Sequence, residues 1–162
     1  MPSPSPAVET VPRILGIDVA KETVVLHDST SGQTLVLSNT PGCLRKGLAA
    51  FAGADLLVCE ATGGYERNLL AAALAIGIAA HRAEPARVKA FIRSHGGHAK
   101  TDAIDARWLS RYGHDRFDQL PRWQPTDPRR LALAGLVRYR QDLLKQRTQA
   151  RNRRQAPGSE PV

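Results

Sequence analysis

Two acidic residues three positions apart, Asp102 and Asp105, are the first candidates for chemistry in this sequence. In a helix, positions i and i+3 are neighbours on one face, so both carboxylates would point at one target. Thr101 is a suitable N-cap, which predicts a helix from Asp102 to about Tyr112 that closes at Gly113. The alternative is a solvated, well-capped helix start, because acidic residues there complement the helix dipole. The spacing alone leaves both interpretations open.

Two further acids stand in predicted strands. Residues 13–20 form an apolar, β-branched run that predicts a buried strand, and this run contains Asp18. A carboxylate in such a strand is costly unless it is paired, binds a metal or accepts backbone hydrogen bonds at the strand end. Residues 55–60 predict a second buried strand with Glu60 at its carboxyl end. In open α/β sheets this end is where sites are built.

The order of the predicted elements is typical of the ribonuclease H type of fold. Strands are predicted at 13–20, 23–28, 34–39, 55–60 and 78–83, and helices at 43–52, 65–76, 85–93 and 102–112. In that fold the first and fourth strands are neighbours and a late helix packs over their ends. We therefore expect an α/β domain with a mixed five-stranded sheet flanked by helices, followed by a long basic coiled-coil helix.

Asp18, Glu60, Asp102 and Asp105 would converge in this fold. Four carboxylates around one point repel each other unless hard divalent cations lie between them, and oxygen ligands suit Mg²⁺ or Mn²⁺. Two such ions about 4 Å apart activate the attacking oxygen and stabilise the leaving oxygen in phosphodiester displacement. We therefore expect the four acids to be the metal ligands and catalytic residues of an enzyme that acts on nucleic acid.

Positive charge is concentrated in the second half of the chain. Residues 1–83 contain six Lys and Arg against seven Asp and Glu, whereas residues 84–162 contain 17 against eight. This asymmetry favours nucleic acid as the partner over a membrane surface. The alternative role for the basic residues that flank Asp102 and Asp105 is charge balance. The predicted nucleic-acid contacts are Lys100, Arg107, Arg138, Arg140, Lys145, Arg147, Arg151, Arg153 and Arg154.

The predicted organisation has five parts: a disordered leader at 1–11, a catalytic domain at 12–113, a linker at 114–128, a helix at 129–154 and a disordered tail at 155–162. An apolar stripe on the helix over 129–154 predicts assembly into a dimer or tetramer. The sequence shows no signal peptide and no apolar run long enough to cross a bilayer, which favours a cytoplasmic protein. Surface positions or backbone-phosphate contacts are expected for His81, His95, His98 and His114.

Three spaced segments also resemble the insertion-sequence 110 transposases: residues 16–21, residues 59–66 and residues 99–106. With the Piv-type DNA invertases, these form the bridge-RNA-guided recombinases, and the resemblance covers about residues 11–154. It implies a RuvC-like domain whose Asp18, Glu60, Asp102 and Asp105 bind metal. It also implies DNA as the substrate and a structured guide RNA as a further partner.

The resemblance implies one more part, which this sequence does not show. In the family, a separate C-terminal domain beyond the coiled coil supplies a serine nucleophile for strand transfer. After Asp105 the only serines are Ser110 and Ser159, and neither has the setting of a nucleophile. We therefore expect the metal-binding half of a DNA transposase of the DEDD type, incomplete and inactive in strand exchange by itself.

Other functions remain as alternatives. The main one is a non-catalytic module that binds nucleic acid and oligomerises through the helix over 129–154. The actin type of phosphotransferase shares the core, but its phosphate hairpin usually needs Gly where this chain has Ala20. A P-loop is excluded, because Ala99 precedes Lys100 and Thr101 where that motif requires Gly.

Overall fold

The computed structural model describes residues 11–97 and 102–155, without the side chains of residues 102–104. The chain divides into two compact units, Met1–Trp123 and Gln124–Val162. The first unit contains a sheet with helices, and the second contains one long helix. None of the described helices is both long enough and apolar enough to cross a membrane.

The sheet of the first unit has five strands in the order β3-β2-β1-β4-β5. The strands are β1 (Ile14–Val19), β2 (Thr23–Asp28), β3 (Thr34–Ser38), β4 (Leu56–Glu60) and β5 (Ala80–Ala83). β1 is antiparallel to β2 and parallel to β4, and β4 is parallel to β5. The predicted mixed five-stranded sheet, with the first and fourth strands side by side, is therefore confirmed.

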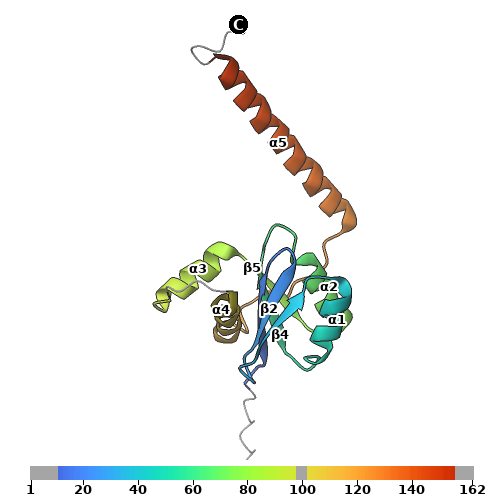
Figure 1. Ribbon diagram of the computed structural model, residues 1–162, viewed down its shortest axis with the longest axis vertical. Coiled ribbons are helices and arrows are strands. Elements are labelled where there is room, and N and C mark those ends of the chain that lie inside the picture. Colours follow the sequence, from blue (N-terminus) through green and yellow to red (C-terminus); the bar gives the residue numbers. More distant parts are fainter. Residues whose placement is uncertain (1–10, 98–101, 156–162) are drawn as a thin grey trace, which may run out of the picture. The chain divides into compact units, whose positions relative to one another are not determined.

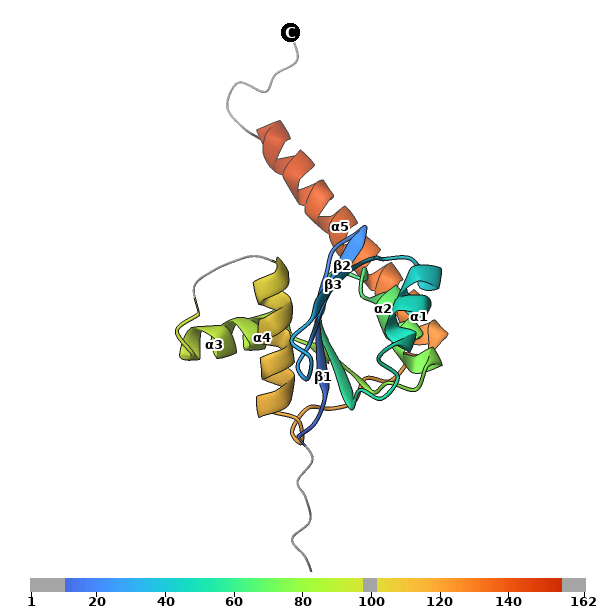
Figure 2. The ribbon, with the colours of Figure 1, turned by 60° about the horizontal axis from the view of Figure 1, so that its bottom comes forward.

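Helices cover both faces of the sheet (Figure 1). They are α1 (Pro41–Ala49) and α2 (Arg67–Ala75) on one face, and α3 (Pro85–Ser94) and α4 (Asp102–Asp115) on the other, as Figure 2 shows. Side chains alternate along a strand, so each strand contributes to both cores. Leu15, Ile17 and Cys59 pack in the core of α1 and α2, whereas Ile14 and Val58 pack in the core of α3 and α4.

Two glycines let α4 lie directly against the sheet. A Cβ at Gly16 would overlap the carbonyl oxygen of Ala106 and the backbone nitrogen of Ser110. A Cβ at Gly113 would come within 2.7 Å of methyl groups of Ile14 and Val58. The prediction that the helix ends at Gly113 was wrong, because α4 continues to Asp115. This glycine serves close helix–sheet packing and does not end the helix.

The first unit extends beyond α4 into the segment predicted as linker. Leu120 is buried, and the backbone nitrogen of Trp123 donates to the carbonyl oxygen of Ala80 at 2.6 Å. Nδ1 of His81 lies 2.9 Å from the carbonyl oxygen of Pro121. His81 is only 8% exposed, so its predicted surface position was wrong. The division of the chain at Trp123 lies ten residues beyond the predicted end of the catalytic domain at 113, and the predicted five-part organisation stays a prediction.

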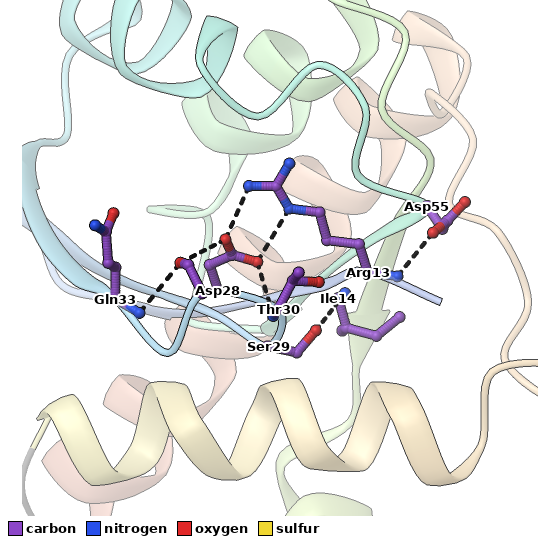
Figure 3. Close-up of polar contacts among 8 residues, drawn as sticks. Arg13, Ile14, Asp28, Ser29, Thr30, Gln33 and Asp55 are labelled. Carbon is purple, nitrogen blue, oxygen red and sulfur yellow. Dashed lines mark hydrogen bonds and ion pairs between the residues drawn. The ribbon is translucent and has the colours of Figure 1, made fainter. Parts of the chain in front are cut away.

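A part-buried ion pair closes the β2–β3 hairpin onto the start of β1 (Figure 3). Nε and Nη2 of Arg13 donate to the two carboxylate oxygens of Asp28 at 3.1 and 2.8 Å. Thr30 and Ser31 donate to the same carboxylate, whose side chain is fully buried. The Arg13 guanidinium holds the pKa of Asp28 well below its ordinary value, although burial opposes this shift. The strand that carries Asp18 is therefore anchored at the residue just before it.

The second unit contains α5 (Pro128–Gln155), and none of its described residues is buried. Its large apolar residues lie between Leu131 and Leu144, and among them Leu133, Leu136 and Val137 are 61%, 67% and 47% exposed. The part from Lys145 onward is mostly polar and basic. The predicted long basic helix is thus present, with both its apolar and its charged side chains exposed.

Candidate metal centre

Asp18 and Glu60 lie at the carboxyl ends of two neighbouring parallel strands. The register pairs Ile17 of β1 with Cys59 of β4, and each acid follows its paired residue by one position. Parallel neighbours lie about 4.8 Å apart, and paired positions share a face. Because Ile17 and Cys59 pack toward α1 and α2, the alternation directs Asp18 and Glu60 to the face of α4. Both acids are half-buried.

Helix α4 runs along β1 toward this same end. Gly113 lies over Ile14, and Ala106 and Ser110 lie over Gly16. Helix α4 therefore runs antiparallel to β1. Asp18 lies two residues, or about 6.6 Å, beyond Gly16 along the strand. Position 102 lies four residues, or about 6 Å along the helix axis, before Ala106. The first turn of α4 therefore reaches the end of β1 at which Asp18 and Glu60 lie.

The buried stripe of α4 continues into the positions of its acids. Ala106, Leu109 and Ser110 are 0%, 1% and 3% exposed and pack against the sheet. Asp105 precedes Leu109 by four residues, and position 102 precedes Ala106 by four, so both positions continue the stripe. Asp105 is accordingly half-buried. A solvated helix start would instead place Asp105 on the outer face, so the burial favours a site.

The structure brings the predicted residues together only in part. Among the side chains that it describes, no three His, Cys, Asp or Glu groups are arranged to hold a metal ion. The Asp102 side chain and the whole of Lys100 and Thr101 lie outside the described residues. Arg107 is exposed on α4, and the basic residues predicted on α5 belong to the other unit. The metal-ligand set and the nucleic-acid contacts therefore stay predictions.

A buried carboxylate shapes the loop that follows Glu60. Glu66 is 2% exposed, and its Oε2 accepts hydrogen bonds from the backbone nitrogens of Thr62 and Gly64 at 3.1 and 2.9 Å and from the Thr62 hydroxyl at 3.1 Å. Its other oxygen lies 2.8 Å from Nε of Arg82 on β5. Burial raises the pKa of Glu66, but the hydrogen bonds together lower it below its ordinary value. Glu66 is therefore ionised and holds the loop in shape.

Asn39 connects this loop to the exit of β1. Its Nδ2 donates to the carbonyl oxygen of Ala20 at 2.9 Å and to that of Tyr65 at 3.0 Å. Ala20 lies two residues after Asp18, and Tyr65 lies five residues after Glu60. One side chain thus joins the two segments that leave the candidate site.

Sequence reasoning missed both of these supporting residues. Glu66 had a local signal, because an acid that follows Thr62, Gly63 and Gly64 can accept their backbone hydrogen bonds. Asn39 had no comparable signal, since its partners lie 19 and 26 residues away. Only the folded chain brings them together.

Two solved structures are similar to this chain in fold. One is Thermus thermophilus RuvC in complex with a Holliday junction substrate, with a TM-score of 0.55, 11% identity and coverage of 69% of this chain and 99% of that one. The other is Thermus thermophilus RuvC, with a TM-score of 0.52, 14% identity and coverage of 68% and 99%. These likenesses confirm the RuvC-like fold.

Curated relatives are found in Moraxella. The pilin gene-inverting proteins of Moraxella lacunata and Moraxella bovis are each 29% identical over 151 residues, which is 88% of this chain and 46% of theirs. The chain therefore spans about half the length of these relatives. The model of the DEDD_Tnp_IS110 transposase family matches residues 15–156, which is nearly the whole chain. The chain belongs to this family of transposases.

Proposed function

We propose that Asp18, Glu60, Asp102 and Asp105 hold Mg²⁺ or Mn²⁺ and that the chain is the metal-binding part of a DEDD-type DNA recombinase. The observation that carries the proposal is the shared strand end: Asp18 and Glu60 follow the last paired residues of β1 and β4, and the first turn of α4 reaches them. The transposase family supports a DNA-processing enzyme. The gene-inverting relatives and the junction-bound RuvC support DNA as the substrate.

The residues present suit a hard divalent cation. Asp18 and Glu60 on the sheet and Asp105 on α4 are half-buried and offer oxygen ligands only, the donor type that Mg²⁺ and Mn²⁺ prefer. When bound, such ions activate the attacking oxygen and stabilise the leaving oxygen of a phosphodiester. Asp18 and Glu60 would hold their ligands on the rigid sheet, and α4 would deliver the acids of its first turn. Arg107, two residues after Asp105, does not share a face of α4 with it, so we propose it as a contact to the DNA backbone away from the carboxylates.

Calorimetric titration with Mn²⁺ tests the metal site. The isosteric variants Asp18→Asn and Asp105→Asn should each weaken Mn²⁺ affinity by about tenfold or more, because each loses a charged ligand. Asp118→Asn is the matched control, since Asp118 is an exposed acid beyond the end of α4. Affinity that is equal in the parent chain and in both site variants would contradict the proposal. Circular dichroism on each variant distinguishes loss of binding from loss of folding.

A second candidate function concerns α5 and does not require catalysis. Leu136, Tyr139 and Leu143 follow the spacing of a coiled-coil seam and are 67%, 64% and 45% exposed. An exposed seam of this kind would be buried by a second copy of the helix, so we propose that α5 assembles the protein into a dimer or tetramer. Sedimentation should show a smaller species for the double variant Leu136→Glu and Leu143→Glu. An unchanged species would exclude this seam.

The end of α5 is proposed to bind nucleic acid. Arg147, Arg151 and Arg154 recur at intervals of four and three residues, so they share one helix face. Replacing all three with Gln should weaken binding and reduce the salt dependence of affinity, since fewer counterions are released. Parallel titrations with DNA and with a structured RNA distinguish a substrate role from guide-RNA binding. No change with either polymer would contradict a nucleic-acid role for this face.

A further inference from the structure

A pocket of about 540 Å³ lies between α4 and the β2–β3 hairpin, within the first unit. The hairpin contributes His27 and Ser29, and α4 contributes Arg107, Arg111, His114 and Asp115. Asp18, Glu60 and Asp105 do not line the pocket, yet α4 lines it with the turns that follow Asp105. A function of the pocket can therefore be linked to the candidate metal centre through one rigid helix.

The basic residues of α4 converge on this pocket because of their spacing. Arg111 follows Arg107 by four residues and His114 follows it by seven, so the three share one helix face. Across the pocket, His27 is paired with Gly16 in the register of β2 and β1. The backbone of α4 lies directly over Gly16, which brings His27 beside the helix. Two elements far apart in sequence thus present donors to one space.

The charges around the pocket leave it positive. Asp115 is the one acid among its lining residues, and its carboxylate lies 3.7 Å from Arg111 and 3.4 Å from His114. Arg107 and Arg111 together exceed that single negative charge. Burial lowers the pKa of His27, and the nearby charge of Arg107 lowers it further. His27 therefore faces the pocket as a neutral imidazole in a positive field.

Neutral donors complete the lining. Nδ1 of His27 lies 3.3 Å from the hydroxyl of Thr34. In the tautomer in which Nδ1 accepts this bond, Nε2 carries the proton and can donate. The hydroxyl oxygen of Ser29 accepts from the backbone nitrogen of Ile14 at 2.8 Å, which leaves its O–H as a donor. Two guanidinium groups with an imidazole and a hydroxyl are the donor set of a phosphate site.

We propose that this pocket binds a backbone phosphate of the DNA strand on which the carboxylates act. The inference rests on the proposed function, because the strand is defined by its place at the metal centre. At about 1.5 Å per helix residue, Arg111 lies roughly 9 Å along α4 from Asp105. That is the length of about three nucleotide steps at about 3.4 Å each. The pocket would hold the strand a few nucleotides from the bond to be cut.

The test uses the whole chain, with DNA and RNA of equal length and with inorganic phosphate as the local probe. The double variant Arg107→Gln and Arg111→Gln should bind DNA about tenfold more weakly, because two charge-assisted contacts are lost. Inorganic phosphate should shift the NMR signal of the His27 imidazole in the parent chain and not in this variant. Arg45→Gln is the matched control, an exposed arginine of α1 on the opposite face of the sheet.

Asp115→Asn gives a prediction of opposite sign. Removing the one carboxylate of the lining should strengthen phosphate and DNA binding severalfold, because the pocket becomes more positive. DNA affinity that is unchanged in the double variant, or a loss confined to RNA, would overturn the inference. Mn²⁺ titration of the same variants separates the two proposals. If the pocket variants bind DNA as the parent chain does but still bind Mn²⁺, the pocket inference fails and the proposed function stands. Absence of metal binding in the parent chain would contradict the proposed function itself.

Discussion

Asn39 donates a hydrogen bond from its side-chain amide to the carbonyl oxygen of Tyr65 at 3.0 Å, although the two residues lie 26 positions apart. The same Nδ2 donates to Ala20 at 2.9 Å. Asn39 is 7% exposed, so both bonds are protected from water. The segments that follow Asp18 and Glu60 are therefore joined by one buried amide. The connection between these two segments depends on a residue that carries no charge.

Replacing Asn39 by Ala should lower the free energy of unfolding by about 1–3 kcal/mol, because two buried carbonyl oxygens lose their donor. We also expect a severalfold loss of Mn²⁺ affinity, since Asn39 would no longer join the segments that follow Asp18 and Glu60. Urea unfolding and calorimetric titration measure the two effects. Asn68→Ala is the control, because exposed Asn68 donates only to the backbone of Asn39, at 3.2 Å. Metal affinity that is the same in both variants would exclude a positioning role for Asn39.

Glu66→Gln should destabilise the first unit by about 2–3 kcal/mol, more than an exposed substitution would. The neutral amide keeps one acceptor oxygen and replaces the other with an NH₂ donor. In either orientation this NH₂ group faces another donor, either the guanidinium of Arg82 or the backbone N–H groups of Thr62 and Gly64. Chemical unfolding near pH 7 measures the loss.

Arg82→Gln is the companion to this variant. Arg82 is 46% exposed, and Glu66 keeps its three other hydrogen bonds without it. Its replacement should therefore cost less than Glu66→Gln. A larger cost for Arg82→Gln would mean that the ion pair, and not the loop hydrogen bonds, holds this segment.

Gly16→Ala tests the close approach of α4 to β1. The added Cβ would overlap backbone atoms of Ala106 and Ser110, which cannot rotate away as a side chain can. The helix must shift, and we expect a loss of about 3 kcal/mol or more. Because α4 also carries Asp105, Mn²⁺ affinity should fall in the same variant. Gly42→Ala is the control, since a Cβ at Gly42 meets nothing within 4 Å.

The sequence was sufficient for the five strands and their order, because the strand runs depend on local patterns. The four acids stay a prediction as metal ligands. Strand runs ending at Glu60 and containing Asp18 can be recognised from neighbouring residues. Gly113 was misread as a helix end, since its actual role depends on Ile14 and Val58 in distant strands. His81 was misplaced for the same reason, because its partner Pro121 is 40 residues away. Contacts of this kind are set by tertiary packing and leave no periodicity.

His81 should make stability depend on pH near neutrality. Burial lowers the pKa of His81, and nearby Arg122 and Arg87 lower it further, although the bond to Pro121 opposes the shift. The unfolded chain binds a proton as pH falls through about 6.5, whereas the folded chain stays neutral until its lower pKa. The stabilisation is therefore complete above about pH 6.5 and declines below it, by at most about 1.4 kcal/mol per pH unit.

The variant His81→Asn isolates this contribution. The Asn amide can still donate to the carbonyl oxygen of Pro121, but it does not titrate. Urea unfolding between about pH 7.5 and 5 should show a steeper loss in the parent chain than in His81→Asn. His27, whose pKa is also lowered, remains in both proteins, so the difference between the two slopes reports His81 alone. Parallel slopes would mean that His81 keeps the same pKa in the folded and unfolded chains, and its burial against Pro121 would then carry no electrostatic cost.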